Sequence, residues 1–299
     1  MLVSANRLRR VVFDEVHLIY FWKEFRDVLD SLKSLRAKPF QLVLLSATVP
    51  PLLVDNILQS IGTNRLTCNI YREETTKKNL IYNVNKYSDS SDKLALLTSF
   101  IRSFNFKYRR GMIFCLSKVE VEELKEYLKD CFPGLHVGCY YSGDQMGEIE
   151  KKQALEKWIS IQPSVMICTK ALGHGLDYAE IDFTIHIGMP DNLSEYQQET
   201  GRIGRRGQTS ECVVLFSDNG QSVDSNVEEF VKGKKCRREV LQTYLDGPGT
   251  YVCKEKGYEM CDICRIPDLP DDINFDDEFN DEDLALIDME GTLIIIRFN

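Results

Sequence analysis

Two acidic residues follow directly on a short apolar run near the start of the chain. Val11–Phe13 is predicted to form a β-strand, and Asp14 and Glu15 stand at its carboxyl end. In a sheet that hydrolyses a nucleotide, an acid in this position holds Mg²⁺, and its neighbour can polarise the attacking water. Exposed acids in loops show the same pattern, so the pair indicates a nucleotide site only in combination with neighbouring motifs. His17 follows closely, and the next apolar strand, Gln41–Leu45, runs into Ser46, Ala47 and Thr48.

Two arginines three residues apart form the second candidate site. Arg202 and Arg205 lie in the segment Gln197–Gly207, beside two glycines. A helix is predicted over Ser194–Ile203, and on a helix this spacing places both guanidinium groups on one face. Guanidinium is permanently charged and forks onto phosphate oxygens, which suits the charge that develops on a transferred phosphoryl group. A basic helix end exposed to solvent is the alternative.

Ten cysteines fall into two groups. Four of them have sixteen, seven and two residues between successive members, and this set is Cys236, Cys253, Cys261 and Cys264. Four thiolates with one Cys-x-x-Cys knuckle match tetrahedral Zn²⁺ ligation, and a chance grouping of core cysteines is the alternative. The remaining six occur singly in apolar stretches and are predicted to be reduced, buried thiols: Cys68, Cys115, Cys131, Cys139, Cys168 and Cys212.

The elements that must position these residues alternate regularly. Strands are predicted at 112–116, 136–141, 165–168, 183–187 and 212–216, with helices of ten or more residues between several of them. This alternation predicts an α/β fold built on a parallel sheet covered on both faces. After the strand at 165–168, the loop Thr169–Asp177 carries two glycines, which let a backbone approach a phosphate chain.

The charge is unevenly distributed. The net charge is −9, but eleven acids and no Lys or Arg lie between residues 266 and 296, so the body of the chain is nearly neutral. An acidic tail does not exclude nucleic acid as a partner. The apolar runs are far shorter than the roughly 20 residues that span a bilayer, and the N-terminus lacks a signal-peptide pattern. We therefore expect no membrane partner and a cytosolic or nuclear protein.

Taken in order, these segments resemble the RecQ family of superfamily 2 helicases, which are 3′–5′ DNA helicases, over about residues 8–265. The strongest matches are Asp14–His17, Thr169–Asp177 and Tyr196–Gly207, with Ser46-Ala47-Thr48 as the accompanying SAT segment. The family also carries a zinc-binding module after its second motor domain, where the four cysteines stand. The resemblance implies RecA-like parallel sheets: a partial first motor domain over 1–62, a linker over 63–92, and a complete second motor domain over 93–218. A zinc module over 219–267 and a disordered acidic tail over 268–299 follow.

The resemblance also implies roles for individual residues. Asp14 would bind Mg²⁺, Glu15 would act as the base, and Arg202 and Arg205 would contact the γ-phosphate of ATP. Residues that couple ATP to movement would be His17, Ser46, Thr48, Gly173, Asp177 and Gln198. Residues that bind DNA would be Trp22, Phe25 and Arg26, in a loop similar to the family's aromatic-rich loop, together with Thr169 and Lys170. Trp22 and Phe25 fit a buried helix face equally well.

The sequence also departs from the family's pattern. Residues 1–299 contain no phosphate-binding loop ending in Gly-Lys-Ser/Thr, since Gly233-Lys234 is followed by Lys235. We therefore expect a truncated DNA helicase that is not active alone, with ATP, Mg²⁺ and structural Zn²⁺ as ligands and single-stranded or forked DNA as partner. The resemblance implies a nuclear location and leaves the oligomeric state open. A non-catalytic remnant that binds DNA or a partner is one alternative. An RNA helicase of the same superfamily is the other, although the four cysteines argue against it.

Overall fold

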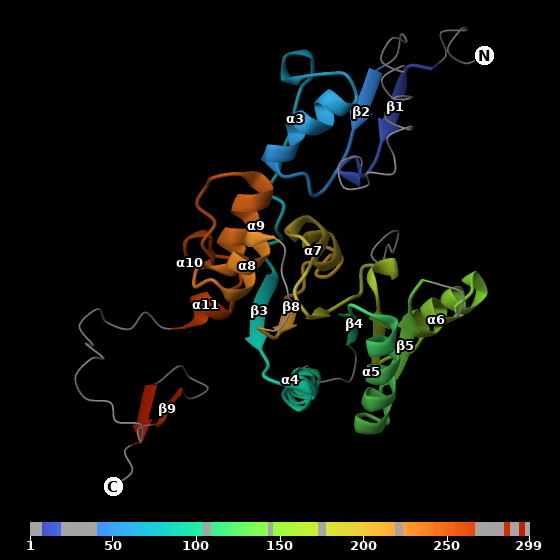
Figure 1. Cartoon of the computed structure of the whole chain (residues 1–299), viewed down its shortest axis with the longest axis vertical. Coiled ribbons are helices and arrows are strands. Elements are labelled where there is room, and N and C mark those ends of the chain that lie inside the picture. The colour runs from blue at the N-terminus through green and yellow to red at the C-terminus, as the bar shows by residue number, and fades with distance from the viewer. Residues whose placement is uncertain are drawn as a thin grey trace.

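The structure is a computed structural model that describes residues 8–18, 41–103, 109–142, 146–172, 178–218, 224–266, 284–287 and 293–296. Figure 1 shows three parts along the chain. We call residues 8–18 and 41–62 the first lobe, residues 80–218 the second lobe, and residues 224–266 the cysteine module. Among the described helices, none is both long and apolar enough to cross a membrane.

The first lobe brings the two predicted motif-bearing strands side by side. β1 (Arg10–Phe13) and β2 (Gln41–Leu44) are parallel, with Phe13 opposite Leu44. The ladder continues past the strand ends, because Leu45 N donates to Phe13 O at 2.8 Å and Val16 N donates to Leu45 O at 2.9 Å. Parallel strands end at the same edge, so the residues after each strand meet there. Helix α3 (Pro51–Ser60) follows, with proline at its first position, where the fixed φ angle favours a helix start.

The second lobe is a parallel sheet whose described strands run in the order β3-β8-β7-β4-β6-β5, which confirms the expected α/β class. The strands are β3 (Leu80–Lys86), β4 (Arg110–Phe114), β5 (His136–Tyr140), β6 (Ser164–Cys168), β7 (Phe183–Ile187) and β8 (Ser210–Phe216). Helices α4 (Ser90–Ser103) and α5 (Lys118–Cys131) pack on one face. Helices α6 (Glu148–Ser160) and α7 (Leu193–Thr200) pack on the other. Every residue of β4, β6 and β7 is buried, as a sheet covered on both faces requires.

Two predicted boundaries need correction. The predicted linker over 63–92 contains β3, which pairs with β8 from Leu80 opposite Ser210 to Lys86 opposite Phe216, and α4 begins at Ser90. β3 is an edge strand with polar residues, so its sequence lacks the apolar run of the central strands. The tail predicted to be disordered contains β9 (Leu284–Ile287) paired antiparallel with β10 (Leu293–Ile296). The many acidic residues of the tail dominate its composition, so these two short apolar runs were not recognised as strands.

The cysteine module packs against β3 at the edge of the sheet (Figure 1). It consists of α8 (Ser225–Lys232), α9 (Arg237–Asp246), α10 (Cys253–Lys256) and α11 (Asp262–Arg265). Arg238 of α9 is fully buried and joins the two parts. Its guanidinium donates to Lys77 O at 2.8 Å and Leu80 O at 2.6 Å, and it lies 5.1 Å from the Tyr82 ring centroid. Module and sheet therefore share one continuous core.

Replacing Arg238 with Met should lower the free energy of unfolding by about 3 kcal/mol, because two buried carbonyl groups lose their donor. Arg102 is exposed on α4 and lies 5.8 Å from the Phe132 ring centroid, so Arg102→Met is a matched control. That control should change stability by no more than about 0.5 kcal/mol. Urea unfolding followed by fluorescence measures both. Equal effects of the two substitutions would contradict the role given to Arg238.

Candidate active site between the lobes

The acidic pair lies at the carboxyl end of β1, as predicted. Asp14 is exposed, and its Oδ1 accepts a hydrogen bond from Glu15 N at 2.9 Å. Glu15 has a φ angle of 51°, in the left-handed region that residues with a side chain rarely adopt. Such a conformation costs on the order of 1 kcal/mol and often occurs where a side chain must be aimed at a site. The turn leaves the Glu15 side chain 45% exposed beside the buried ring of His17.

His17 joins the acidic pair to the end of β2. The His17 ring is buried, and its Nδ1 lies 2.7 Å from Ser46 Oγ and 3.3 Å from Glu15 Oε2. Ser46 Oγ also accepts from Thr48 N at 3.3 Å. The two segments that the sequence analysis paired, Asp14–His17 and Ser46–Thr48, are therefore one hydrogen-bonded unit.

Gln198 reaches this unit from α7 of the second lobe. Its Nε2 donates to Glu15 Oε2 at 3.1 Å and lies 2.9 Å from His17 Nε2. An amide nitrogen can only donate, so His17 Nε2 is the acceptor and the proton of the neutral ring sits on Nδ1. This tautomer directs the proton toward Ser46 Oγ and Glu15 Oε2.

The two arginines follow α7, but not on a helix face. The prediction of a helix over 194–203 carrying both guanidinium groups on one side is wrong, because α7 ends at Thr200 and Gly201 caps it. Gly201 N still donates to Gln197 O at 2.7 Å, and the chain then turns. We call residues 201–207 the arginine loop. Within it Arg202 is buried and Arg205 is exposed, so the two side chains have different surroundings.

Two side chains that the sequence analysis missed hold the arginine loop in place. Lys77 Nζ donates to Gly201 O at 2.7 Å and to Ile203 O at 2.8 Å. Asn79 Nδ2 donates to Gly204 O at 3.0 Å and to Gln208 O at 2.6 Å. Their partners are backbone carbonyls far away in sequence, so no motif marks them.

Arg205 influences the pKa values of two neighbouring cationic groups, Arg202 and Lys77. Burial lowers the pKa of Arg202 and Arg205 lowers it further, while Glu199 and Glu15 act in the opposite direction. Burial also lowers the pKa of Lys77, again with a contribution from Arg205. An arginine stays charged through shifts of this kind. Arg205 is thus close enough to influence both Lys77 and Arg202, and Arg202 is close enough to interact with Glu15.

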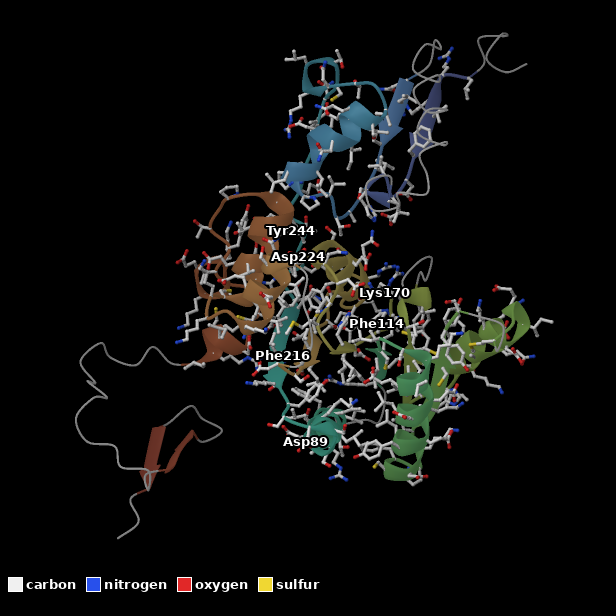
Figure 2. All side chains as sticks on the ribbon, viewed as in Figure 1. Asp89, Phe114, Lys170, Phe216, Asp224 and Tyr244 are labelled. Atoms are coloured by element: carbon white, nitrogen blue, oxygen red, sulfur yellow. The ribbon has the colours of Figure 1, made fainter. Side chains whose placement is uncertain are left out.

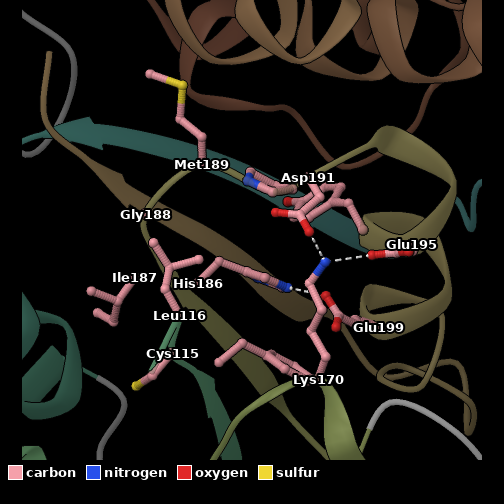
Figure 3. Close-up of a pocket in the computed structure, with 13 residues that line it drawn as sticks. Cys115, Leu116, Lys170, His186, Ile187, Gly188, Met189, Asp191, Glu195 and Glu199 are labelled. Carbon is pink, nitrogen blue, oxygen red and sulfur yellow. Dashed lines mark hydrogen bonds and ion pairs between the residues drawn. The ribbon is translucent and has the colours of Figure 1, made fainter. Parts of the chain in front are cut away.

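A second group of polar residues lies at the carboxyl ends of β6 and β7. Thr169 and Lys170 follow β6, and Lys170 Nζ donates to Asp191 and, at 2.7 Å, to Glu195 (Figure 3). His186, at the end of β7, is buried with its Nε2 2.9 Å from Glu199 Oε2. Figure 2 shows Lys170 and Phe114 near this edge of the sheet. A shallow pocket here is lined by Phe114, Cys115, Leu116, Lys170, His186, Ile187, Gly188, Met189, Pro190, Asp191, Glu195, Tyr196 and Glu199.

Other predicted site residues lie outside the described part of the chain. These are Gly173 and Asp177 of the glycine-containing loop, and Trp22, Phe25 and Arg26 of the predicted aromatic-rich loop. Their roles remain predictions.

The four cysteines of the module come together as their spacing predicts. All four are buried, and their Sγ atoms lie within 4.8 Å of one another. Cys236 Sγ is 3.4 Å from Cys253 Sγ and 3.8 Å from Cys261 Sγ. A tetrahedral Zn²⁺ with Zn–S bonds of about 2.3 Å separates its sulfurs by about 3.8 Å, so the cluster fits this ion. Burial raises the pKa of Cys264 to about 12, and a bound cation would favour its thiolate.

Of the six cysteines predicted to be buried singly, four are buried. The prediction is wrong for Cys68 and Cys131, which are partly exposed.

Comparisons with known proteins identify the class to which this fold and candidate site belong. Residues 92–207 match the family model of the helicase conserved C-terminal domain. The ATP-dependent DNA helicase Q-like 4B of Arabidopsis thaliana is 30% identical over 224 residues, which cover 73% of this chain and 18% of that protein. The ATP-dependent DNA helicase RecQ of Bacillus subtilis is 28% identical over 268 residues, covering 86% and 40%. The chain belongs to the RecQ family of superfamily 2 helicases.

A solved structure supports the fold. The structure of S. cerevisiae Dbp5 bound to RNA and ADP BeF3 aligns with a TM-score of 0.59 at 18% identity, covering 83% of this chain and 61% of that one. At this identity the likeness concerns the fold alone. The chain spans well under half the length of the two DNA helicases above.

Two glycines of the arginine loop provide a matched test of how tightly it is held. Gly204 and Gly207 both have positive φ angles, +65° and +82°. A Cβ on Gly204 would lie 2.6 Å from Asn79 Nδ2, whereas one on Gly207 would meet nothing within 4 Å. Gly207→Ala should cost about 1 kcal/mol of stability through φ alone, and Gly204→Ala about 1–2 kcal/mol more through the clash. Urea unfolding measures the difference, and equal costs would contradict the packing of Asn79 on this loop.

Proposed function

We propose that this chain acts as part of an ATP-dependent DNA helicase that moves 3′ to 5′ and couples DNA unwinding to ATP hydrolysis between the two lobes. The observation that carries the proposal is the pair of hydrogen bonds from Gln198 of the second lobe to Glu15 and His17 of the first. Gln198 stands four residues before Arg202 in the chain. The contact therefore presents the arginine loop to the acidic pair, the arrangement needed for phosphoryl transfer between two lobes.

Each residue has a distinct task in this proposal. Asp14 has exposed carboxylate oxygens at the end of β1, which suit Mg²⁺, and the ion would neutralise charge on the phosphates of ATP. Glu15 orients the attacking water and accepts its proton. Arg205, which is exposed, contacts the γ-phosphoryl oxygens, and Arg202 adds positive charge from its buried position. Gln198 holds Glu15 in position across the lobe boundary.

DNA is proposed to run across the carboxyl edge of the second sheet. Thr169 and Lys170 stand there, after β6, where a hydroxyl and an ammonium group can contact backbone phosphates. In open parallel sheets, ligands bind outside the carboxyl ends of the strands.

We further propose that the cysteine module binds one structural Zn²⁺ through Cys236, Cys253, Cys261 and Cys264. The four buried thiols and their spacing support this proposal. The ion would contribute directly to folding of the module, whose buried residues share one core with β3.

Purified under reducing conditions, the protein should contain about one zinc per chain. Cys261→Ser should abolish this content and unfold the module, because three thiolates do not close the site. Cys139→Ser is the matched control, since Cys139 is also buried but stands alone in β5. Elemental analysis and protection of residues 224–266 from proteolysis are the measurements. A folded module without metal would contradict the zinc proposal.

Catalysis requires parts that residues 1–299 do not supply by themselves. These residues contain no Gly-Lys-Ser/Thr run to hold the β- and γ-phosphates, so the chain alone should show no DNA-stimulated ATP hydrolysis. A version extended ahead of Met1 by a segment carrying that loop should hydrolyse ATP. Glu15→Gln should then lower kcat about 100-fold or more, and Arg205→Ala about 1000-fold. Arg102→Ala, on the exposed side of α4, should leave kcat unchanged.

Phosphate release measured with single-stranded DNA, forked DNA and RNA separates the alternatives. Hydrolysis by residues 1–299 alone that Glu15→Gln abolishes would contradict the need for the added loop. Hydrolysis by the extended protein that is insensitive to Glu15→Gln would contradict the catalytic assignment. Stimulation by RNA and not by DNA would favour an RNA helicase.

A further inference from the structure

The ammonium group of Lys170 is held by two carboxylates from a neighbouring segment. Lys170 follows β6, Asp191 lies between β7 and α7, and Glu195 lies in the first turn of α7. Nζ donates to both acids, with Glu195 Oε2 at 2.7 Å. Figure 3 shows the ammonium group between the two carboxylates at the pocket. All three side chains are at least one-third exposed, so an incoming ligand can reach them.

The two carboxylates accept hydrogen bonds from an ammonium group that can equally bind a phosphate. Burial lowers the pKa of Lys170, and the hydrogen bonds to Asp191 and Glu195 outweigh this effect, so the net shift is upward. The amine is therefore charged, and its donors are directed at anionic oxygens. A phosphodiester also presents anionic oxygens to an ammonium group. The two carboxylates take two of the three N–H donors of the ammonium group, so a nucleic acid phosphate that uses either of these donors must displace a carboxylate oxygen.

Glu195 is positioned by the first turn of α7. Asn192 caps α7, with its Oδ1 accepting from Glu195 N at 2.8 Å. Negative side chains in the first turn of a helix are stabilised by the helix dipole. Glu195 thus has a reason to remain beside Lys170 that does not depend on Lys170 itself.

We propose that Asp191 and Glu195 form an internal latch that occupies Lys170 in place of a nucleic acid phosphate and so weakens binding of single-stranded nucleic acid at this edge. The inference rests on the proposed nucleic-acid function of Thr169 and Lys170. It adds two residues that set the strength of that contact and that lie outside the family-matching segments Thr169–Asp177 and Tyr196–Gly207. A strand binds here by displacing the carboxylates, and the latch closes again when the strand leaves.

The test is a double-mutant cycle on the intact chain, with an oligothymidylate probe followed by fluorescence anisotropy over a series of salt concentrations. Asp191→Asn with Glu195→Gln should tighten binding about fivefold, as expected for two partly exposed ion pairs. The slope of log affinity against log salt should steepen by about 0.7, the value for one added phosphate contact on a single strand. In a Lys170→Gln background the same two substitutions should give no gain.

A control separates the latch from general charge. Glu126→Gln removes an exposed acid that pairs with Lys129 at 3.0 Å on α5, and it should leave binding unchanged. An equal gain from Asp191→Asn with Glu195→Gln in the wild-type and Lys170→Gln backgrounds would overturn the latch, because the acids would then act only by repulsion. No gain in either background would overturn it as well.

A measurement without nucleic acid distinguishes failure of the latch from failure of the proposed function. Acetylation of Lys170 by acetic anhydride, quantified by mass spectrometry, should be faster in the Asp191→Asn, Glu195→Gln variant, because loss of the carboxylates lowers the pKa of the amine. An unchanged rate contradicts the latch whatever the DNA result. A faster rate with no oligothymidylate binding by any variant contradicts the nucleic-acid function, and the inference falls with it.

Discussion

The hydrogen bonds of Gln198 are the constraint on which the active-site arrangement depends. One amide nitrogen donates to Glu15 and to His17, and these two residues belong to the other lobe. His17 in turn contacts Ser46, whose hydroxyl accepts from Thr48 N. A change in the position of Gln198 therefore alters the contacts of Glu15 and His17 and, through His17, those of the residues after β2. Since α7 runs directly into the arginine loop, the same change moves the cations.

The cysteine module is connected to this site through a short series of contacts. Arg238 of the module binds the carbonyl groups of Lys77 and Leu80. The side chain of Lys77 then binds the carbonyl groups of Gly201 and Ile203 in the arginine loop. The module is thus connected through Lys77 to the backbone of the arginine loop. The position of the module next to the second lobe therefore bears on the arginine loop as well as on its own stability.

The sequence predicted what local pattern controls. Apolar runs predicted the central strands, and the positions of Asp14, Glu15 and the four cysteines followed from motif and spacing. It failed at one local signal, the glycine that ends α7, and at features whose determinants are not local. Gly201 ended α7 before the arginines, and the polar edge strand β3 was placed in a linker. Lys77 bonds to backbone carbonyls more than a hundred residues away, and no residue pattern records such a contact.

The central claim is that Gln198 holds the second lobe against the acidic pair of the first. The most direct test is a pulsed electron–electron double resonance measurement of the distance between two nitroxide labels. Each label is attached to an unnatural amino acid that carries a ketone. Suitable positions are Leu66, which follows the first lobe and is 96% exposed, and Ile149 of the second, which is 74% exposed. The account predicts one narrow distance distribution that broadens in Gln198→Ala and not in Gln59→Ala, whose side chain is exposed on α3. A distribution that is broad from the start, or that Gln198→Ala leaves unchanged, would contradict the account.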